Sequence, residues 1–94
     1  MAPEVLEGKR YSSKADIWSI GVCFYEMLYG RPPYSAKNLV ELLKKIKSTP
    51  VYFPSRKPVA DCVKDVIRRM LEKTPQKRIN WEELFNHPVT RYLE

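Results

Sequence analysis

The chain has 94 residues, of which 44% are hydrophobic and 30% are charged, so its composition is that of a soluble globular protein rather than of a disordered segment. Its net charge of +6 comes from 17 Lys and Arg against 11 Asp and Glu. These positive residues are scattered along the chain, whereas a protein that binds nucleic acid usually clusters them on one element, so we expect no nucleic-acid partner.

Three features bear on the compartment. The longest apolar stretch, residues 17–28, is far shorter than the ~20 residues that cross a bilayer, so no membrane span is expected. Residues 1–4 lack the basic start and apolar core of a signal peptide. Cys23 and Cys62 lack the spacing of a disulfide or zinc framework, and both stand among apolar residues, where a free cysteine packs as a small buried hydrophobe. We therefore expect a reducing compartment and a cytoplasmic location.

The first half of the chain predicts two helices. Residues 3–6 read as a short helical turn, because proline suits the first helical position and glutamate suits the positive end of a helix. A longer helix is expected to begin at a cap on Ser12 or Ser13 and to run to about residue 29, where Gly30 ends it.

The longer of these helices is apolar nearly all round. Such a helix is typical of the inside of a protein rather than of its surface. Trp18 and Met27 are therefore both expected in the core.

The middle of the chain predicts one helix and one irregular segment. Asn38 can cap a helix over residues 38–47 that carries apolar residues on one side and lysines opposite. Three prolines then keep residues 48–58 out of regular helix.

The last third predicts two more helices. Apolar residues recur at three- and four-residue steps over residues 60–72, which is typical of an amphipathic helix. Residues 74–78 read as a turn. Asn80 then caps a short last helix, with Glu83 in the reciprocal position of a capping box. The fold class predicted from these elements is all-α, with about four to five helices.

Four short motifs occur in a fixed order. Residues 2–4 read A-P-E, residues 16–21 read D-x-W-S-x-G, and residues 30–34 read G-x-x-P-Y. Lys and Arg at 77–78 precede N-W-E-E-L-F-N-H-P at 80–88. In this order and spacing the motifs resemble the end of the activation segment, the central helix and the last helix of eukaryotic-type protein kinases.

This resemblance implies a partial protein kinase domain over residues 1–94, from the end of the activation segment to the last helix. The implied fold is an incomplete helical subdomain of the kinase C-lobe. The sequence of residues 11–21 and 25–30 resembles that of serine/threonine kinases, among them the autophagy-initiating kinases and the related calcium-regulated and cell-cycle groups. The complete form would transfer phosphate from ATP, with magnesium, to protein Ser and Thr.

The resemblance also indicates what this chain lacks. In the family the Gly-rich loop, the strand lysine, H-R-D and D-F-G all lie upstream of A-P-E, and none of them occurs here. We therefore expect no catalytic, cofactor-binding or metal-binding residue in this chain, and no catalytic competence alone.

Three residues carry structural roles by resemblance. The family pairs the glutamate at Glu4 with the arginine at Arg78, and arginine suits this because its planar fork binds a carboxylate through two parallel hydrogen bonds. By resemblance, Asp16 would accept hydrogen bonds from the backbone of the catalytic loop. The alternative without the family is a carboxylate that is stabilised only by the dipole of its own helix.

Further residues of the central helix have implied roles. Cys23 and Met27 match the floor of a hydrophobic stack that ends at the adenine ring. Glu26 matches a position that helps to recognise basic substrate side chains in some kinases. The alternative is that it is an acidic residue of a helix without a role in substrate recognition. His87, the only histidine, is expected to be structural.

The partners implied are the missing upstream kinase segment and protein substrates or regulators. Kinases commonly carry a methionine just before A-P-E, so Met1 is expected to be an internal residue of a longer product. The alternative is a natural short, non-catalytic interaction module that docks partners through the helix of residues 38–47. A small basic nucleic-acid binder is motivated by the net charge alone and predicts strongly salt-dependent binding.

Overall fold

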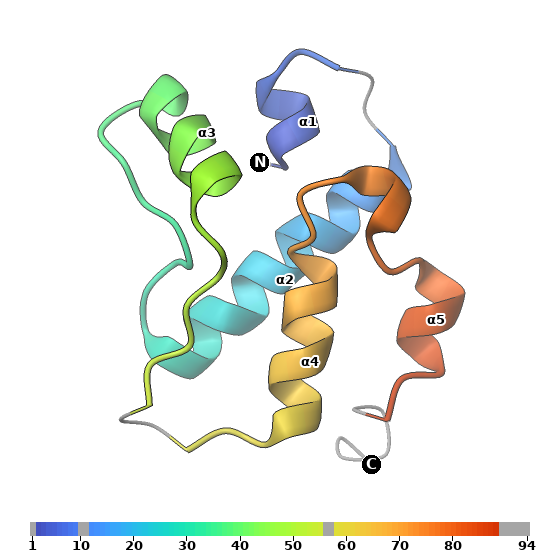
Figure 1. Cartoon of the computed structure of the whole chain (residues 1–94). Helices are drawn as coiled ribbons and strands as arrows, with labels where there is room; N and C mark the ends of the chain where they lie inside the picture. Colours follow the sequence, from blue (N-terminus) through green and yellow to red (C-terminus); the bar gives the residue numbers. More distant parts are fainter. Residues whose placement is uncertain (1, 10–11, 56–57, 89–94) are drawn as a thin grey trace.

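The computed structural model describes residues 2–9, 12–55 and 58–88, and Met1, whose interpretation as an internal residue is given above, lies outside them (Figure 1). The described residues contain five α-helices, a 3₁₀ turn and no strand, which confirms the predicted all-α class. The elements are α1 (Pro3–Leu6), α2 (Ser13–Tyr29), α3 (Leu39–Ser48), α4 (Asp61–Met70), η1 (Pro75–Lys77) and α5 (Trp81–Phe85).

The ends of α2 follow the predicted bounds. Ser12 occupies the N-cap position with extended backbone, although its side chain makes no capping hydrogen bond. Gly30 ends the helix in the left-handed conformation at φ 77°, which a residue with a Cβ rarely adopts, and its N–H donates to the Glu26 carbonyl at 2.8 Å.

Side-chain caps begin α3 and α5 as predicted. The Asn38 Oδ1 accepts from the Glu41 N–H at 2.9 Å. At α5 the Glu83 N–H donates to the Asn80 Oδ1 at 2.8 Å, and the Asn80 N–H donates to the Glu83 Oε1 at 3.1 Å, which completes the capping box. Helix α4 is shorter than the predicted span of residues 60–72. Ala60 and Leu71 do not have helical backbone geometry, and they flank the helix as its two caps.

The core forms where α2 crosses α4 (Figure 1). A Cβ placed on Gly21 would lie 2.9 Å from the Met70 Cβ, so only glycine lets the two helices approach this closely. The buried apolar side chains of the core are Ala2, Ala15, Ile17, Trp18, Tyr25, Ile46, Val66, Ile67, Met70, Leu71 and Ile79.

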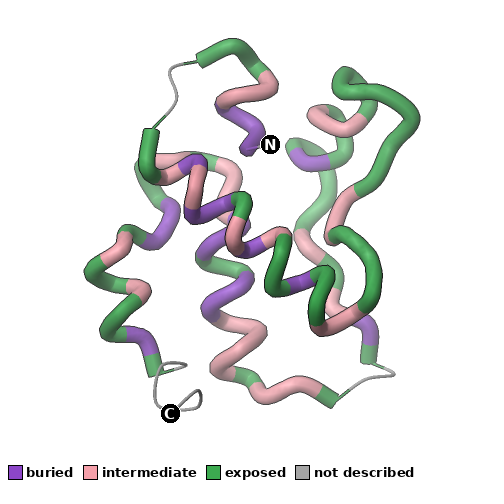
Figure 2. Tube along the Cα trace, turned by 180° about the vertical axis from the view of Figure 1, so that it is seen from behind, coloured by how far each residue is buried: buried purple, intermediate pink, exposed green. Residues whose placement is uncertain are grey.

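The second half of α2 corrects two predictions, the burial of Met27 and that of Cys23. Met27 is 79% exposed, and Phe24 and Cys23 are also exposed, so Met27 and Cys23 are not core residues of this chain. In Figure 2 buried, intermediate and exposed residues alternate along this helix. Trp18, Gly21 and Tyr25 are buried on the side of α2 that lies opposite Cys23 and Met27, so the described elements cover this apolar helix on one side alone. Cys62 is half-buried.

None of the described helices is both long enough and apolar enough to span a membrane.

Candidate functional site

A buried ion pair joins α1 to the segment that follows η1. Arg78 and Glu4 are 1% and 5% exposed. The Arg78 Nη1 donates to the Glu4 Oε2 at 2.8 Å, and its Nη2 donates to the Glu4 Oε1 at 2.9 Å. This is the two-bond fork that the family resemblance implies, and it spans 74 positions of the chain.

Two further donors of Arg78 bind backbone carbonyls. Its Nη1 also donates to the Lys14 carbonyl at 2.7 Å, and its Nε donates to the Glu72 carbonyl at 2.9 Å. The guanidinium carbon lies 5.3 Å from the centroid of the Trp18 ring, within the range of a cation–π contact. One buried side chain therefore connects α1, the start of α2 and the loop after α4.

Lys14 reinforces the same junction from the first turn of α2. Its ammonium donates to the Arg78 carbonyl at 2.6 Å and to the Pro75 carbonyl at 3.1 Å. Arg78 and Lys14 thus hold each other's backbone carbonyls, which fixes the position of η1 against α2. Sequence reasoning did not identify Lys14, because a single lysine before an apolar helix carries no pattern of its own.

The Glu4 carboxylate is ionised in this setting. Burial raises the pKa of Glu4, but the hydrogen bonds and the charge of Arg78 lower it by more. The pKa of Glu4 therefore lies below its ordinary value of 4.5. A charge that is buried, paired and hydrogen-bonded in this way is strongly tied to its partner.

The other predicted site residues lie on α2. Asp16, Cys23 and Met27 are separated by seven and four positions, and at 100° per residue these positions fall within about 40° of one another on one stripe of the helix. Asp16 is half-buried in the first turn, while Cys23 and Met27 are exposed. Glu26 is exposed beside this stripe, near the end of the helix. Their assigned roles as catalytic-loop anchor, stack floor and substrate-docking acid stay predictions.

A second charged cluster is formed by Asp65, Arg69 and His87, and the sequence did not indicate that these residues meet. The His87 ring, which is buried, places Nε2 2.7 Å from the Asp65 Oδ2, and the Arg69 Nε lies 3.0 Å from the same oxygen. The hydrogen bond from His87 lowers the pKa of Asp65, burial raises it, and the charge of Arg69 lowers it again, so the pKa lies below its ordinary value. His87 thereby joins the end of α5 to α4, in keeping with the structural role expected for it. The spacing of Asp65 and Arg69 by four residues was the available sequence signal.

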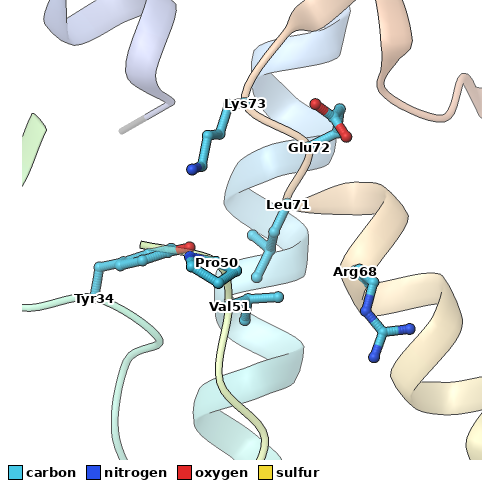
Figure 3. A pocket seen from close by; sticks show the side chains of 7 residues that line it. All are labelled: Tyr34, Pro50, Val51, Arg68, Leu71, Glu72 and Lys73. Carbon is cyan, nitrogen blue, oxygen red and sulfur yellow. The ribbon is translucent and has the colours of Figure 1, made fainter. Parts of the chain in front are cut away.

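A pocket of about 300 Å³ opens between the loop after α3 and the end of α4 (Figure 3). Pro50, Val51 and Leu71 supply its apolar lining. Figure 3 shows Lys73 and Arg68 on opposite sides of this lining. The pocket joins an apolar floor to two cations and the carboxylate of Glu72, an arrangement that the sequence did not indicate because its walls come from distant segments.

Within the described residues, no group of three or more His, Cys, Asp or Glu side chains is arranged to hold a metal ion.

Comparison with known proteins places these features in a family context. The family model for the protein kinase domain matches residues 1–90. The chain is 50% identical over 91 residues to the serine/threonine-protein kinase apg-1 of Neurospora crassa, which covers 95% of this chain and 9% of that protein. It is 48% identical to the serine/threonine-protein kinase atg1 of Botryotinia fuckeliana and 47% identical to ATG1 of Sclerotinia sclerotiorum, in each case over 95% of this chain and 10% of the relative. The chain thus spans about a tenth of the length of these relatives.

Proposed function

The chain belongs to the protein kinase domain family, and we propose that it supplies the activation-segment anchor and a docking surface of a serine/threonine kinase. It corresponds to a helical part of the C-lobe and resembles the fungal autophagy kinases. In the proposal, the complete kinase transfers the γ-phosphoryl group of ATP to Ser and Thr hydroxyls of protein substrates.

The observation that carries the proposal is the buried pair of Glu4 and Arg78. Glu4 belongs to the A-P-E motif and is held by two hydrogen bonds from Arg78, which two further hydrogen bonds fix to the Lys14 and Glu72 carbonyls. A positioned activation segment matters because phosphoryl transfer depends chiefly on holding the reacting groups in place. The pair would provide that position from outside the reacting centre.

The exposed stripe of α2 supports the same assignment. Asp16, Cys23 and Met27 lie along one side of the helix, and Phe24 adds further exposed apolar surface near them. An exposed apolar helix face suits a partner that brings apolar side chains. We propose that the upstream kinase segment is this partner.

The chemistry itself would come from outside this chain. Its three glycines form no Gly-rich phosphate loop, and neither H-R-D nor D-F-G occurs. ATP and magnesium would therefore be bound by other parts of the complete kinase, and the chain alone would not be catalytically competent. A cytoplasmic location is proposed because Cys23 is a free, exposed thiol, which suits a reducing compartment.

A chimera tests the proposal directly. Residues 2–88 of this chain replace the matching segment in the kinase of Neurospora crassa, and transfer of labelled phosphate to a protein substrate is measured. We expect an active chimera, with Glu4→Gln lowering the rate and the exposed change Glu41→Gln leaving it unchanged. The 94-residue chain alone should transfer no phosphate. A folded but inactive chimera, or equal activity of the Glu4→Gln and Glu41→Gln forms, would refute the anchoring role.

A non-catalytic interaction module is the second candidate, because Leu39 and Val40 at the start of α3 are 60% and 65% exposed. Exposed neighbouring aliphatic residues are a feature of protein-contact surfaces. This candidate predicts that the 94-residue chain is expressed by itself, which detection of an endogenous product of about 11.1 kDa by immunoblot would test.

A further inference from the structure

Lys73 lines two pockets of the molecule, and we name these two pockets together the cationic groove. The first is the pocket of about 300 Å³ over Val51 and Leu71, with Arg68 at its rim. The second has a volume of about 320 Å³ and lies between α1, α3 and the segment before η1. The groove is thus apolar at one end and charged at the other.

The walls of the apolar end are held in place by contacts of their own. The Tyr34 hydroxyl donates to the Thr49 carbonyl at 2.8 Å, and its ring stacks on Trp18 with 6.4 Å between centroids. The Arg68 guanidinium lies 5.3 Å from the centre of the Phe53 ring. A pocket with fixed walls loses little side-chain entropy when a ligand enters it.

The charged end carries an excess of positive charge. Lys9, Lys47 and Lys73 line it, and the Lys73 ammonium donates to the Lys47 carbonyl at 3.0 Å. Glu7 lies 3.5 Å from the ammonium of Lys9 and 3.4 Å from that of Lys47, while Glu4 is already held by its buried arginine. At this end of the groove the ammonium groups of three lysines therefore stand against the single carboxylate of Glu7, because the charge of Glu4 is already balanced by Arg78.

From this arrangement we propose that the cationic groove binds an extended acidic segment of a protein partner. An apolar side chain of that segment fills the pocket over Val51 and Leu71, and neighbouring carboxylates lie among Lys9, Lys47 and Lys73. A nucleic-acid backbone would satisfy the lysines but leave the apolar pocket empty, so a peptide fits both ends better. The inference deepens the docking role proposed above and rests on it.

The test measures binding of labelled ten-residue peptides to the 94-residue chain by fluorescence anisotropy. The reference peptide carries one leucine flanked by glutamates; one control replaces the glutamates by glutamine, and another replaces the leucine by serine. Each replacement should weaken binding about tenfold, corresponding to about 1.4 kcal/mol. Changes in the peptide leave the fold of the protein intact, so this comparison holds even where a protein variant is unstable.

Variants of the protein locate the binding surface. Lys47→Gln with Lys73→Gln should weaken binding of the reference peptide about tenfold, because two of the three facing charges are lost. The matched pair Lys44→Gln with Lys77→Gln removes the same charge from exposed positions outside the groove and should change binding less than about twofold. In amide NMR spectra the reference peptide should shift the signals of Val51 and Lys73.

Equal weakening by the two pairs of variants, or binding that ignores the leucine, would show simple charge attraction and overturn the proposal. Competition by an RNA of random sequence with the same dependence on Lys47 and Lys73 would overturn it as well. Peptide binding requires no ATP, so failure here leaves the activity of the kinase chimera as a separate result.

Discussion

Two charged clusters each join separate elements of the chain, Arg78 to α1 and His87 to α4, and they do so in different ways. In the first, the Arg78 side chain is completely buried, and all its hydrogen bonds go to Glu4 and to backbone carbonyls. In the second, Asp65 is 41% exposed, and one of its oxygens is shared by His87 and the largely exposed Arg69. Both clusters join distant elements, yet only the first excludes water.

This difference decides how much each cluster contributes. A buried charge that loses its partner is left without either water or a counter-ion, whereas an exposed carboxylate that loses a partner is solvated at once. We therefore expect the two clusters to respond to substitution and to acid by very different amounts.

The largest effect should follow from Arg78→Leu. The substitution strands the Glu4 carboxylate and leaves the carbonyls of Lys14 and Glu72 without this donor, so the free energy of unfolding should fall by about 3–5 kcal/mol. Urea denaturation followed by circular dichroism measures the change. Lys77→Leu, at the exposed neighbouring position, is the control; a similar small loss in both variants would contradict the role assigned to Arg78.

Removing both charges should hurt less than removing one. Glu4→Leu combined with Arg78→Met removes the stranded carboxylate, so the double variant should be about 1–3 kcal/mol more stable than Arg78→Met alone. It should remain below the parent chain, because the backbone carbonyls still lose their donor. Additive losses in a double-mutant cycle would rule out the coupling.

Acid should weaken both clusters. Because the pKa values of Glu4 and Asp65 are lowered on folding, their contribution is complete above the ordinary pKa values of 4.5 and 3.8. It is lost as the pH falls below these values and through the folded-state pKa of each group. Urea midpoints between pH 7 and pH 2 should therefore decline in this acid range. Glu4→Gln should flatten the decline more than Asp65→Asn, and the reverse order would mean that the exposed cluster dominates.

The smallest effect should come from the exposed cluster. His87→Ala removes one hydrogen bond to a half-exposed carboxylate, so we expect a loss of about 1 kcal/mol at neutral pH, measured by the same urea titration. Arg69→Ala, on the same carboxylate but largely exposed, should change stability by less than about 0.5 kcal/mol. A loss of more than about 3 kcal/mol for His87→Ala would show that the two clusters are equivalent.

The local devices of the fold could be predicted because their causes are local. The αL glycine at Gly30, the cap at Asn38 and the capping box of Asn80 and Glu83 each involve residues within four positions of one another, so their energetics are written in short stretches of sequence. The pairing of Glu4 with Arg78, in contrast, came from the family resemblance, since spacing alone gives no reason to join residues 74 positions apart.

The helices, the side-chain caps of α3 and α5 and the family follow from the sequence alone. The tertiary structure alone decided which side of α2 is covered, why Met27 is exposed while Met70 is buried, and that Asp65 meets His87. It also brought Val51, next to α3, together with Lys73, beyond α4, to form the cationic groove. The physical reason is that hydrophobicity fixes which side chains gain from burial, but the available cover depends on elements that lie far apart in the chain.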